Sequence, residues 1–425
     1  MTYKEVVDKI ENIRRFGNLT GVEITAQMLE QMGNPQEGMN LIHIAGTNGK
    51  GSVSAFLCAI LKESGLRVGT FVSPHLVDFR ERICVDGRMI EKEAAARIGS
   101  ELLDSEFAVH PTMFDYCLVM AILYFKEQQC DVVILETGLG GRCDSTNAVG
   151  TPKVTVITKI GYDHMAILGD TLEKIANEKA GIIKAGTYLV VESQTDTVQE
   201  VFAKEAKRVG VSAYEVVEPE QFQDCKYEDG MQIFSFGTYK ELKMRILGVH
   251  QYENAAAAIL AAEAFFKSDV SEKLSEAQIR AAVRKGISAA RWQGRMEILR
   301  KEPFLMVDGA HNSNGVEALK RSLMALFPGE KFHFVMGVMA DKDYEKMVEE
   351  LLPLAIDFKT MTVEYERSLA AEALAGCIRK KGIPAQCEQN LSACLAPENC
   401  SGAHKTVAFG SLYFIGEIEA FFRHE

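Results

Sequence analysis

The chain has 425 residues, of which 47% are hydrophobic and 25% are charged, a composition typical of a globular protein that excludes a disordered one. Its formal net charge of −12 disfavours nucleic acid and anionic membranes as partners, so an anionic ligand needs a local binding site. The apolar runs 117–125 and 255–262 are shorter than the roughly 18 residues of a membrane-spanning helix, and the charged segment 1–10 is unlike a secretory signal, so we expect a cytoplasmic protein.

Strand-like runs bounded by glycine or aspartate alternate with amphipathic helical stretches through the first half of the chain. This rhythm is typical of a mostly parallel sheet covered by helices on both faces, and it predicts a doubly wound α/β domain. The predicted strands are 41–45, 68–73, 131–136, 153–159 and 187–192, and the clearest predicted helices are 52–64 and 112–126.

The pattern changes between residues 218 and 245, where short alternating segments predict a small antiparallel insertion. Helices over 254–266 and 275–285 follow, and a second β-α series begins after Arg291-Trp-Gln-Gly-Arg295. We therefore predict two domains, residues 1–294 and residues 295–425, the second being a smaller Rossmann-like α/β domain. Its predicted strands are 304–308, 333–337, 359–363 and 406–410.

The strongest local motif is Gly46-Thr-Asn-Gly-Lys-Gly-Ser52, a glycine-bracketed turn between a predicted strand and a predicted helix. Such a turn directs several backbone N–H groups and a helix N-terminus to one point, which is the arrangement of an ATPase-type phosphate-binding loop. Lys50 would neutralise phosphate charge, and Ser52 would lie near a metal ion. The motif departs from the common G-x-x-x-x-G-K-[ST] pattern, because its first glycine is closer to the lysine and Gly51 follows the lysine directly.

A second motif is the apolar run 131–136, which ends in Glu136 and continues into the glycine-rich segment 137–147. A carboxylate at the carboxyl end of such a strand lies beside the phosphate loop, where it can hold Mg²⁺. Recognition of guanine is excluded, because Thr158-Lys-Ile-Gly161 ends in glycine where a guanine site needs an aspartate.

Two further polar side chains are ambiguous from the residues alone. His164 follows a predicted strand directly after Asp163, where a histidine serves either as a metal ligand or as a hydrogen-bonded structural residue. Lys179 lies on a predicted helix, where a lysine is ordinarily a solvated surface charge.

A series of motifs, in this order, resembles one known family over essentially the whole chain. The motifs are Gly46–Ser52, Ser73-Pro-His-Leu76, Glu136–Arg142 with Asp144 and Thr146-Asn147, Asp163-His164, Glu178–Ile183, His250-Gln251 with Asn254, Arg291, and Asp308-Gly-Ala-His-Asn312. The set is similar to that of the folylpolyglutamate synthase and dihydrofolate synthase family, a branch of the Mur ligase superfamily.

The resemblance implies an ATP-dependent amide ligase that adds L-glutamate to reduced folates and joins L-glutamate to dihydropteroate through an acyl phosphate. It implies two Mg²⁺ ions and a carbamate on Lys179, and we expect a monomer. The implied catalytic residues are Lys50, Lys179 and His164. The implied metal ligands are Ser73, Glu136, His164 and Lys179, and the implied ATP-binding residues are Asn48, Gly49, Lys50, Gly51, Ser52, Asn254, Arg291 and Asp308.

The substrate side of the site also follows from the resemblance. Residues implied at the pterin substrate are Arg82, Thr112, Phe114, Asp115, Cys143, Asp144 and Ser145. Asp115 replaces a glutamate that is common in the family, and Cys143 replaces an aliphatic residue. Residues implied at the incoming L-glutamate are His311, Lys342 and Ser411, of which Ser411 is equally consistent with a helix cap.

Two other assignments fit the sequence less well. A peptidoglycan-precursor ligase of the same superfamily carries an additional uridine-binding domain before the phosphate loop, for which the 45 residues before Gly46 leave no room. An ATP-binding regulator that ligates nothing is disfavoured by Lys179 and by the motifs on the glutamate side.

Overall fold

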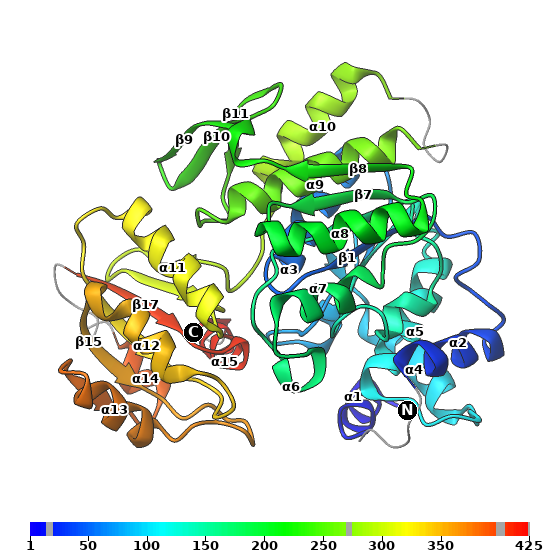
Figure 1. Ribbon diagram of the computed structural model, residues 1–425. Coiled ribbons are helices and arrows are strands. Elements are labelled where there is room, and N and C mark those ends of the chain that lie inside the picture. The colour runs from blue at the N-terminus through cyan, green and yellow to red at the C-terminus, as the bar shows by residue number, and fades with distance from the viewer. Residues whose placement is uncertain (14–19, 269–273, 397–403, 424–425) are drawn as a thin grey trace. The chain divides into compact units, whose positions relative to one another are not determined.

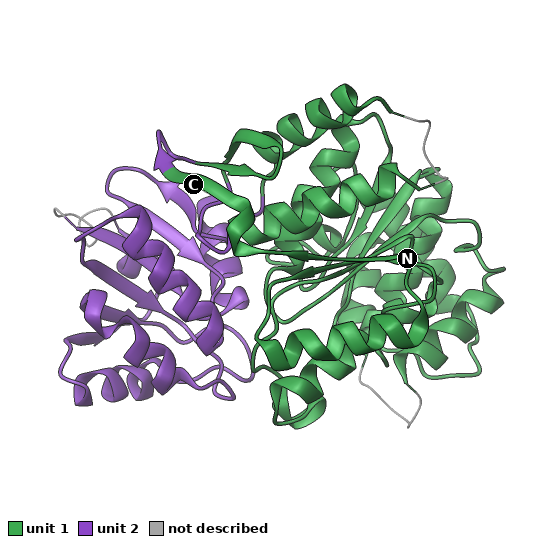
Figure 2. Ribbon diagram, turned by 45° about the horizontal axis from the view of Figure 1, so that its top comes forward, with its two compact units in different colours: residues 1–226, 233–245, 252–291 green, residues 227–232, 246–251, 292–425 purple. Residues whose placement is uncertain are grey.

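The computed structural model describes residues 1–13, 20–268, 274–396 and 404–423, and the chain divides into two compact units (Figures 1 and 2). Across these residues, no helix is both long enough and apolar enough to cross a membrane. The chain passes between the units several times, including directly after Arg245 and directly after Arg291. Unit 1 comprises residues 1–226, 233–245 and 252–291, and unit 2 comprises residues 227–232, 246–251 and 292–425.

An eight-stranded sheet forms the centre of unit 1, with the strand order β4-β3-β2-β5-β1-β6-β7-β8. Neighbours from β2 to β8 pair in parallel, whereas β3 pairs antiparallel with both β2 and β4, so the sheet is mixed. The sequence did not indicate β3, β4 or β8. Two of these strands are very short, and the third, β8, is mostly only half-buried. The bounds are β1 Leu41–Ala45, β2 Val68–Phe71, β3 Ile83–Val85, β4 Arg88–Met89, β5 Val132–Glu136, β6 Val154–Ile157, β7 Tyr188–Glu192 and β8 Ala213–Val217.

Helices cover both faces of this sheet (Figure 1). The helix α3 packs against β1, β2 and β5, and α10 packs on α3. This second contact requires a glycine at position 286, because a Cβ atom there would lie 2.5 Å from the Cα atom of Ile60. The bounds are α1 Tyr3–Glu11, α2 Gly21–Gln31, α3 Lys50–Glu63, α4 Lys92–Asp104, α5 Met113–Glu127, α6 Met165–Leu168, α7 Leu172–Ala180, α8 Asp196–Val209, α9 Gln251–Phe266 and α10 Glu276–Ala289, with 3₁₀ helices η1 Phe79–Arg82, η2 Ser145–Ala148 and η3 Pro219–Gln221.

A small three-stranded sheet of order β11-β10-β9 occupies the segment in which short alternating strands were predicted. Its strands are β9 Phe222–Glu228, β10 Met231–Phe236 and β11 Tyr239–Met244.

Unit 2 contains a six-stranded sheet of order β12-β13-β17-β14-β15-β16, in which β12 is antiparallel and the other pairings are parallel. Alternate residues of its central strands enter two separate apolar clusters, one with α11, α12 and α13 and one with α14 and α15. The bounds are β12 Glu297–Arg300, β13 Leu305–Asp308, α11 Ser313–Leu326, β14 Phe332–Met336, α12 Tyr344–Leu351, η4 Leu352–Leu354, β15 Ala355–Thr360, α13 Ala371–Lys380, β16 Ala385–Cys387, α14 Leu391–Leu395, β17 Lys405–Phe409 and α15 Leu412–Arg423.

One strand lies earlier in the chain than predicted. A strand was predicted over 359–363, but β15 spans Ala355–Thr360. Met361 and Val363 are buried although they follow the strand, because they pack into the cluster that holds α14 and α15. Their burial gives the segment after the strand the apolar character that strand prediction relies on.

Candidate active site

The phosphate loop connects β1 to α3, as its sequence predicts. Gly49 precedes α3 with a φ of 94°, and a Cβ atom on it would lie 2.3 Å from the Oδ1 atom of Asn254. Gly46 is equally confined, since its Cβ would lie 1.8 Å from the Oγ1 atom of Thr158. The N-terminus of α3, with Gly51 and the buried Ser52 in its first turn, follows directly. Backbone N–H groups at this helix start form a cradle of the kind that binds phosphate.

Lys50 and Glu136 lie together at the carboxyl edge of the sheet. The Nζ atom of Lys50 donates to the carbonyl oxygens of Gly46, at 3.2 Å, and Thr47, at 3.4 Å. It also lies 3.8 Å from the Oε1 atom of the buried Glu136 carboxylate. Since β1 and β5 are paired in parallel with Ile44 opposite Glu136, the sheet itself fixes this proximity. A buried carboxylate beside a loop predicted to bind phosphate suits a hard cation such as Mg²⁺.

Lys179 is buried, although a lysine on a helix is ordinarily a solvated surface charge. Its side chain lies near the end of α7, and its Nζ atom donates to the carbonyl oxygen of Gly46 at 2.8 Å. Burial, together with the positive charge of Lys50, lowers the pKa of Lys179 to about 7. A large fraction of this amine is therefore uncharged and nucleophilic near neutral pH.

A glycine allows the segment after β5 to lie close to the end of α7. A Cβ atom on Gly141 would lie 2.9 Å from the carbonyl oxygen of Lys179, and the next residue, Arg142, donates its backbone N–H to Glu178 at 2.8 Å. The glycine-rich segment after β5 therefore lies directly against the last turn of α7.

Ser73 and His164 were the other two predicted metal ligands. Ser73 follows β2 and is half-buried, and β2 pairs in parallel with β5, so Ser73 lies at the same sheet edge as Glu136. His164 is 52% exposed, and its Nε2 atom lies 3.9 Å from the Oδ1 atom of Asp163. Within the described ranges, no three His, Cys, Asp or Glu side chains converge as a metal site would require.

Asp115 joins three elements in the region predicted for the pterin. Its Oδ1 atom accepts hydrogen bonds from the hydroxyls of Thr25, at 2.9 Å, and Ser145, at 2.5 Å. Its Oδ2 atom accepts from the backbone N–H and the hydroxyl of Thr112, at 2.8 and 2.7 Å. Asp115 thus completes the capping box of α5, whose N-cap is Thr112, and ties α5 to α2 and η2, which brings Thr112 and Ser145 together.

The remaining predicted pterin residues differ in exposure. Asp144 is buried and accepts from the backbone N–H groups of Leu139, at 2.7 Å, and Thr146, at 3.1 Å, while burial raises its pKa. Phe114 is half-buried, with its ring centroid 5.4 Å from that of Phe71. Arg82 is buried and donates through Nε to the Nδ1 atom of His75 at 2.8 Å, whereas Cys143 is exposed.

In unit 2, three predicted residues follow the carboxyl ends of neighbouring parallel strands. His311 follows β13, Lys342 follows β14 and Ser411 follows β17, and β17 lies between the other two strands. Parallel strands that end at one edge bring the loops after them close together, and ligands bind there in open α/β sheets. The hydroxyl of Ser411 accepts the backbone N–H of Tyr413 at 3.2 Å, so this serine also caps α15.

Asp308 is accompanied by Arg295, an arginine that was not among the predicted site residues. The Asp308 carboxylate accepts the backbone N–H groups of Met296 and Ala310, each at 2.9 Å, and its pKa is raised by burial although Arg295 opposes this shift. The Nη1 atom of Arg295 would lie 1.9 Å from a Cβ atom on Gly309. Arg291, which was predicted from the same segment to bind ATP, donates to carbonyl oxygens at the end of α10 in unit 1. The sequence signal was present, since Arg295 ends the same five-residue motif.

Comparisons with known proteins agree with this arrangement of the chain. The family model described as the Mur ligase middle domain matches residues 44–262, and the one described as the Mur ligase, glutamate ligase domain, matches residues 294–404. A dihydrofolate synthase/folylpolyglutamate synthase of Bacillus subtilis (strain 168) is 36% identical over 431 residues, which cover 98% of each chain. A dihydrofolate synthase/folylpolyglutamate synthase of Escherichia coli (strain K12) is 32% identical over 371 residues, or 86% of this chain and 83% of that relative.

Solved structures superpose over nearly the whole chain. A Mycobacterium tuberculosis folylpolyglutamate synthase complexed with ADP gives a TM-score of 0.86 at 28% identity, covering 99% of this chain and 98% of that one. An E. coli enzyme in complex with DHPP and ADP gives a TM-score of 0.84 at 26% identity, covering 100% and 98%. The chain therefore belongs to the dihydrofolate synthase/folylpolyglutamate synthase family, with the middle and glutamate-ligase domains of Mur ligases.

Proposed function

We propose that this member of a family of ATP-dependent glutamate ligases acts on both reduced folates and dihydropteroate. The observation that carries the proposal is the match to bifunctional relatives over almost the whole of both chains, which includes the phosphate loop and the glutamate-ligase domain. We place ATP on the loop 46–52, because related structures hold ADP and because the loop has the geometry of a phosphate cradle.

The chemistry requires an activated acid, since a carboxylate is a poor electrophile at neutral pH. An oxygen of the substrate carboxylate attacks the γ-phosphorus of ATP, the bond to the bridging oxygen breaks, and an acyl phosphate and ADP form. The amine of L-glutamate then attacks the acyl carbon and loses a proton, and inorganic phosphate leaves with the electrons of the broken C–O bond. Lys50 would stabilise the charge on the transferred phosphoryl group.

We assign Lys179 as the site of a carbamate. Its uncharged amine would form an N–C bond with CO₂ and release a proton, which converts a buried cation into a carboxylate. The low pKa of Lys179 and its contact with the phosphate loop support this assignment. Ser73, Glu136, His164 and this carbamate would hold Mg²⁺. When bound, Mg²⁺ would offset the repulsion between the substrate carboxylate and the phosphates.

The substrates would occupy the two units separately before reaction. We assign Thr112, Phe114 and Ser145, with Arg82 and Cys143, to the pterin, and we regard Asp115 and Asp144 as the residues that hold this region in shape. We assign His311, Lys342 and Ser411 to L-glutamate. Asn254 in unit 1 would contact the nucleotide.

Mass spectrometry of products tests the proposal directly. The purified chain would be incubated with ATP, Mg²⁺ and L-glutamate, and with either dihydropteroate or tetrahydrofolate. We expect both acids to gain the mass of glutamyl residues, with ADP released in step. An increase in mass with only one of the two acids would reduce the assignment to that one activity. Release of ADP without an increase in the mass of either acid would contradict the assignment. Lys50→Ala serves as the control that abolishes ADP release.

A further inference from the structure

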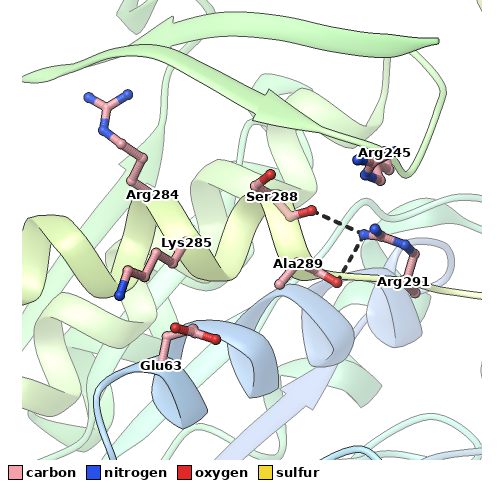
Figure 3. Close-up of a pocket in the computed structure, with 7 residues that line it drawn as sticks. All are labelled: Glu63, Arg245, Arg284, Lys285, Ser288, Ala289 and Arg291. Atoms are coloured by element: carbon pink, nitrogen blue, oxygen red, sulfur yellow. Dashed lines mark hydrogen bonds between the residues drawn. The ribbon is translucent and has the colours of Figure 1, made fainter.

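Unit 1 contains a second place suited to an anion, apart from the phosphate loop. A pocket of about 470 Å³ is lined by Arg245, Arg284, Lys285 and Arg291, together with Glu63 and Ser288 (Figure 3). The described residues that line it include none from the loop 46–52. Four cationic side chains therefore face one carboxylate in a chain whose formal net charge is −12.

The pocket is formed by α10, by the end of α3 and by the residue after β11. Arg284, Lys285 and Ser288 project from α10, and Glu63 is the last residue of α3. Since α3 begins at Lys50 and rises by about 1.5 Å per residue, its two ends lie about 20 Å apart. The Glu63 end of the pocket is thus remote from the phosphate loop.

Two of the three arginines, Arg284 and Arg291, are held in place without being neutralised. The Nη1 atom of Arg284 donates to the carbonyl oxygens of Lys240, at 2.9 Å, and Glu241, at 3.4 Å. The Nη1 atom of Arg291 donates to those of Ser288, at 3.0 Å, and Ala289, at 2.9 Å. These acceptors are uncharged, and across the described part of the chain no carboxylate forms an ion pair with any of the four cations. Each guanidinium keeps further N–H groups that can bind an anion.

The positive charges that line the pocket repel one another, which is a second indication that an anion would be stabilised there. The pKa of Arg291 is lowered by burial and then by the neighbouring charge of Arg245. An anion bound between these two guanidinium groups would remove that repulsion and add charge-assisted hydrogen bonds.

We propose that this pocket is a binding site for a small polyanion that carries at least two carboxylate or phosphate groups. Guanidinium groups bind both kinds of anion in a bidentate manner, and a single charge would leave most of the four cations uncompensated. One source of such a ligand rests on the proposed function, since the γ-linked tail of a polyglutamylated product gains a carboxylate with each addition. The other source is a phosphorylated small molecule.

Two of the arginines that line the pocket lie at the points where the chain leaves unit 1. Arg245 and Arg291 are each the last residue of unit 1 before the chain passes into unit 2. A polyanion held by both would fix the starts of two connecting segments on unit 1. Its binding should therefore slow backbone hydrogen exchange at residues 246–248 and 292–294.

Isothermal titration calorimetry on the full chain tests the site. The protein would first be saturated with AMPPCP and Mg²⁺, so that the phosphate loop is occupied, and then titrated at low ionic strength with tripolyphosphate or with tri-γ-glutamate. We expect one additional site per chain, with an affinity that falls as salt is added. Binding of tripolyphosphate alone assigns a phosphorylated ligand, binding of tri-γ-glutamate alone assigns the product tail, and binding of both assigns a site for either.

Three variants sharpen the test. The double variant Arg245→Gln/Lys285→Gln should weaken binding at least tenfold. Glu63→Gln should tighten it, because it removes the one carboxylate among the described residues that line the pocket. Arg280→Gln changes the same charge on the same helix outside the pocket and should leave the affinity unchanged. Absence of binding to the unaltered chain, or equal affinities for the double variant and Arg280→Gln, would overturn the proposal. Because the titration involves no turnover, its result is independent of whether the ligase assay succeeds.

Discussion

The side-chain amine of Lys179 donates to the carbonyl oxygen of Gly46, the first glycine of the phosphate loop, at 2.8 Å. A helix that ends more than 130 residues further along the chain thus reaches the loop that would hold ATP. The contact links the charge on one buried nitrogen to the geometry of the phosphate site, and several expectations depend on it.

Replacing Lys179 by alanine should lower the ligase rate by about 100-fold, because a group that holds a metal or its ligands typically contributes that much. A short carboxylate such as formate should restore part of the activity of Lys179→Ala, since it can occupy the place of a carbamate. Initial rates of ADP release would measure both effects. Lys179→Arg is the matched control, because its guanidinium cannot be carbamylated and leaves no space for formate. A fully active Lys179→Arg variant would contradict the carbamate.

The stability of the chain should depend on pH in a way that reflects the buried amine of Lys179. The pKa of Lys179 is about 7 in the folded chain, against an ordinary value of 10.5, so the unfolded chain binds more protons between these limits. Burial of Lys179 therefore lowers the free energy of unfolding by its full amount below pH 7, and this loss shrinks as the pH rises toward 10.5. Lys179→Met removes this loss of stability, so the Tm of the variant should exceed that of the unaltered chain by more at pH 6 than at pH 9. Thermal unfolding in CO₂-free buffer would measure the difference, and an equal gain at both pH values would mean that the amine is not buried.

Glu136→Gln should raise the Mg²⁺ concentration needed for half-maximal rate and lower the maximal rate by about 100-fold. The substitution keeps the shape of a buried side chain but removes the charge that faces Lys50 at 3.8 Å. Rates measured over a range of Mg²⁺ concentrations would show both effects. Asp131→Asn, just before the other end of β5, is the control and should leave the Mg²⁺ dependence unchanged. A normal Mg²⁺ dependence in Glu136→Gln would remove this residue from the metal site.

Gly49→Ala should abolish nucleotide binding, whereas Gly65→Ala should not. Both glycines have nearly the same backbone conformation, with φ of 94° and 93°, so each substitution should cost about 1–2 kcal/mol of stability through backbone strain. Only at Gly49 would the new methyl group also meet a neighbour, the Oδ1 atom of Asn254 at 2.3 Å, whereas nothing lies within 4 Å at Gly65. Titration with AMPPCP and thermal unfolding would separate the two effects. Equal losses of affinity in both variants would show that the close approach to Asn254 is unimportant.

The fold could be predicted where local signals and tertiary environment agree. The run Leu41–Ala45 is apolar except for His43, fully buried and followed by a glycine turn, and the predicted strand has the same bounds as β1. The segment around β15 shows the opposite case, since the buried Met361 and Val363 lie outside the strand and moved the prediction along the chain.

Parts of the site depend on contacts that sequence cannot display. By its local sequence, Lys179 looks like a surface lysine on a helix. It is buried because the glycine-rich segment after β5, which is far away in the chain, packs against α7. Arg291 and Arg295 are alike by composition, and only the turn after α10 decides that Arg295 accompanies Asp308 while Arg291 lines the basic pocket.

The packing of α10 on α3 bears on how the nascent chain leaves the ribosome. The helix α3 is complete at Glu63, but α10, which covers it through Gly286, is complete only at Ala289. At about 5–20 residues per second, the ribosome needs roughly 10–45 s to synthesise the residues between them. During that interval the surface of α3 around Ile60 lacks the helix that later covers it, so this part of the newborn protein should be open to binding by a chaperone.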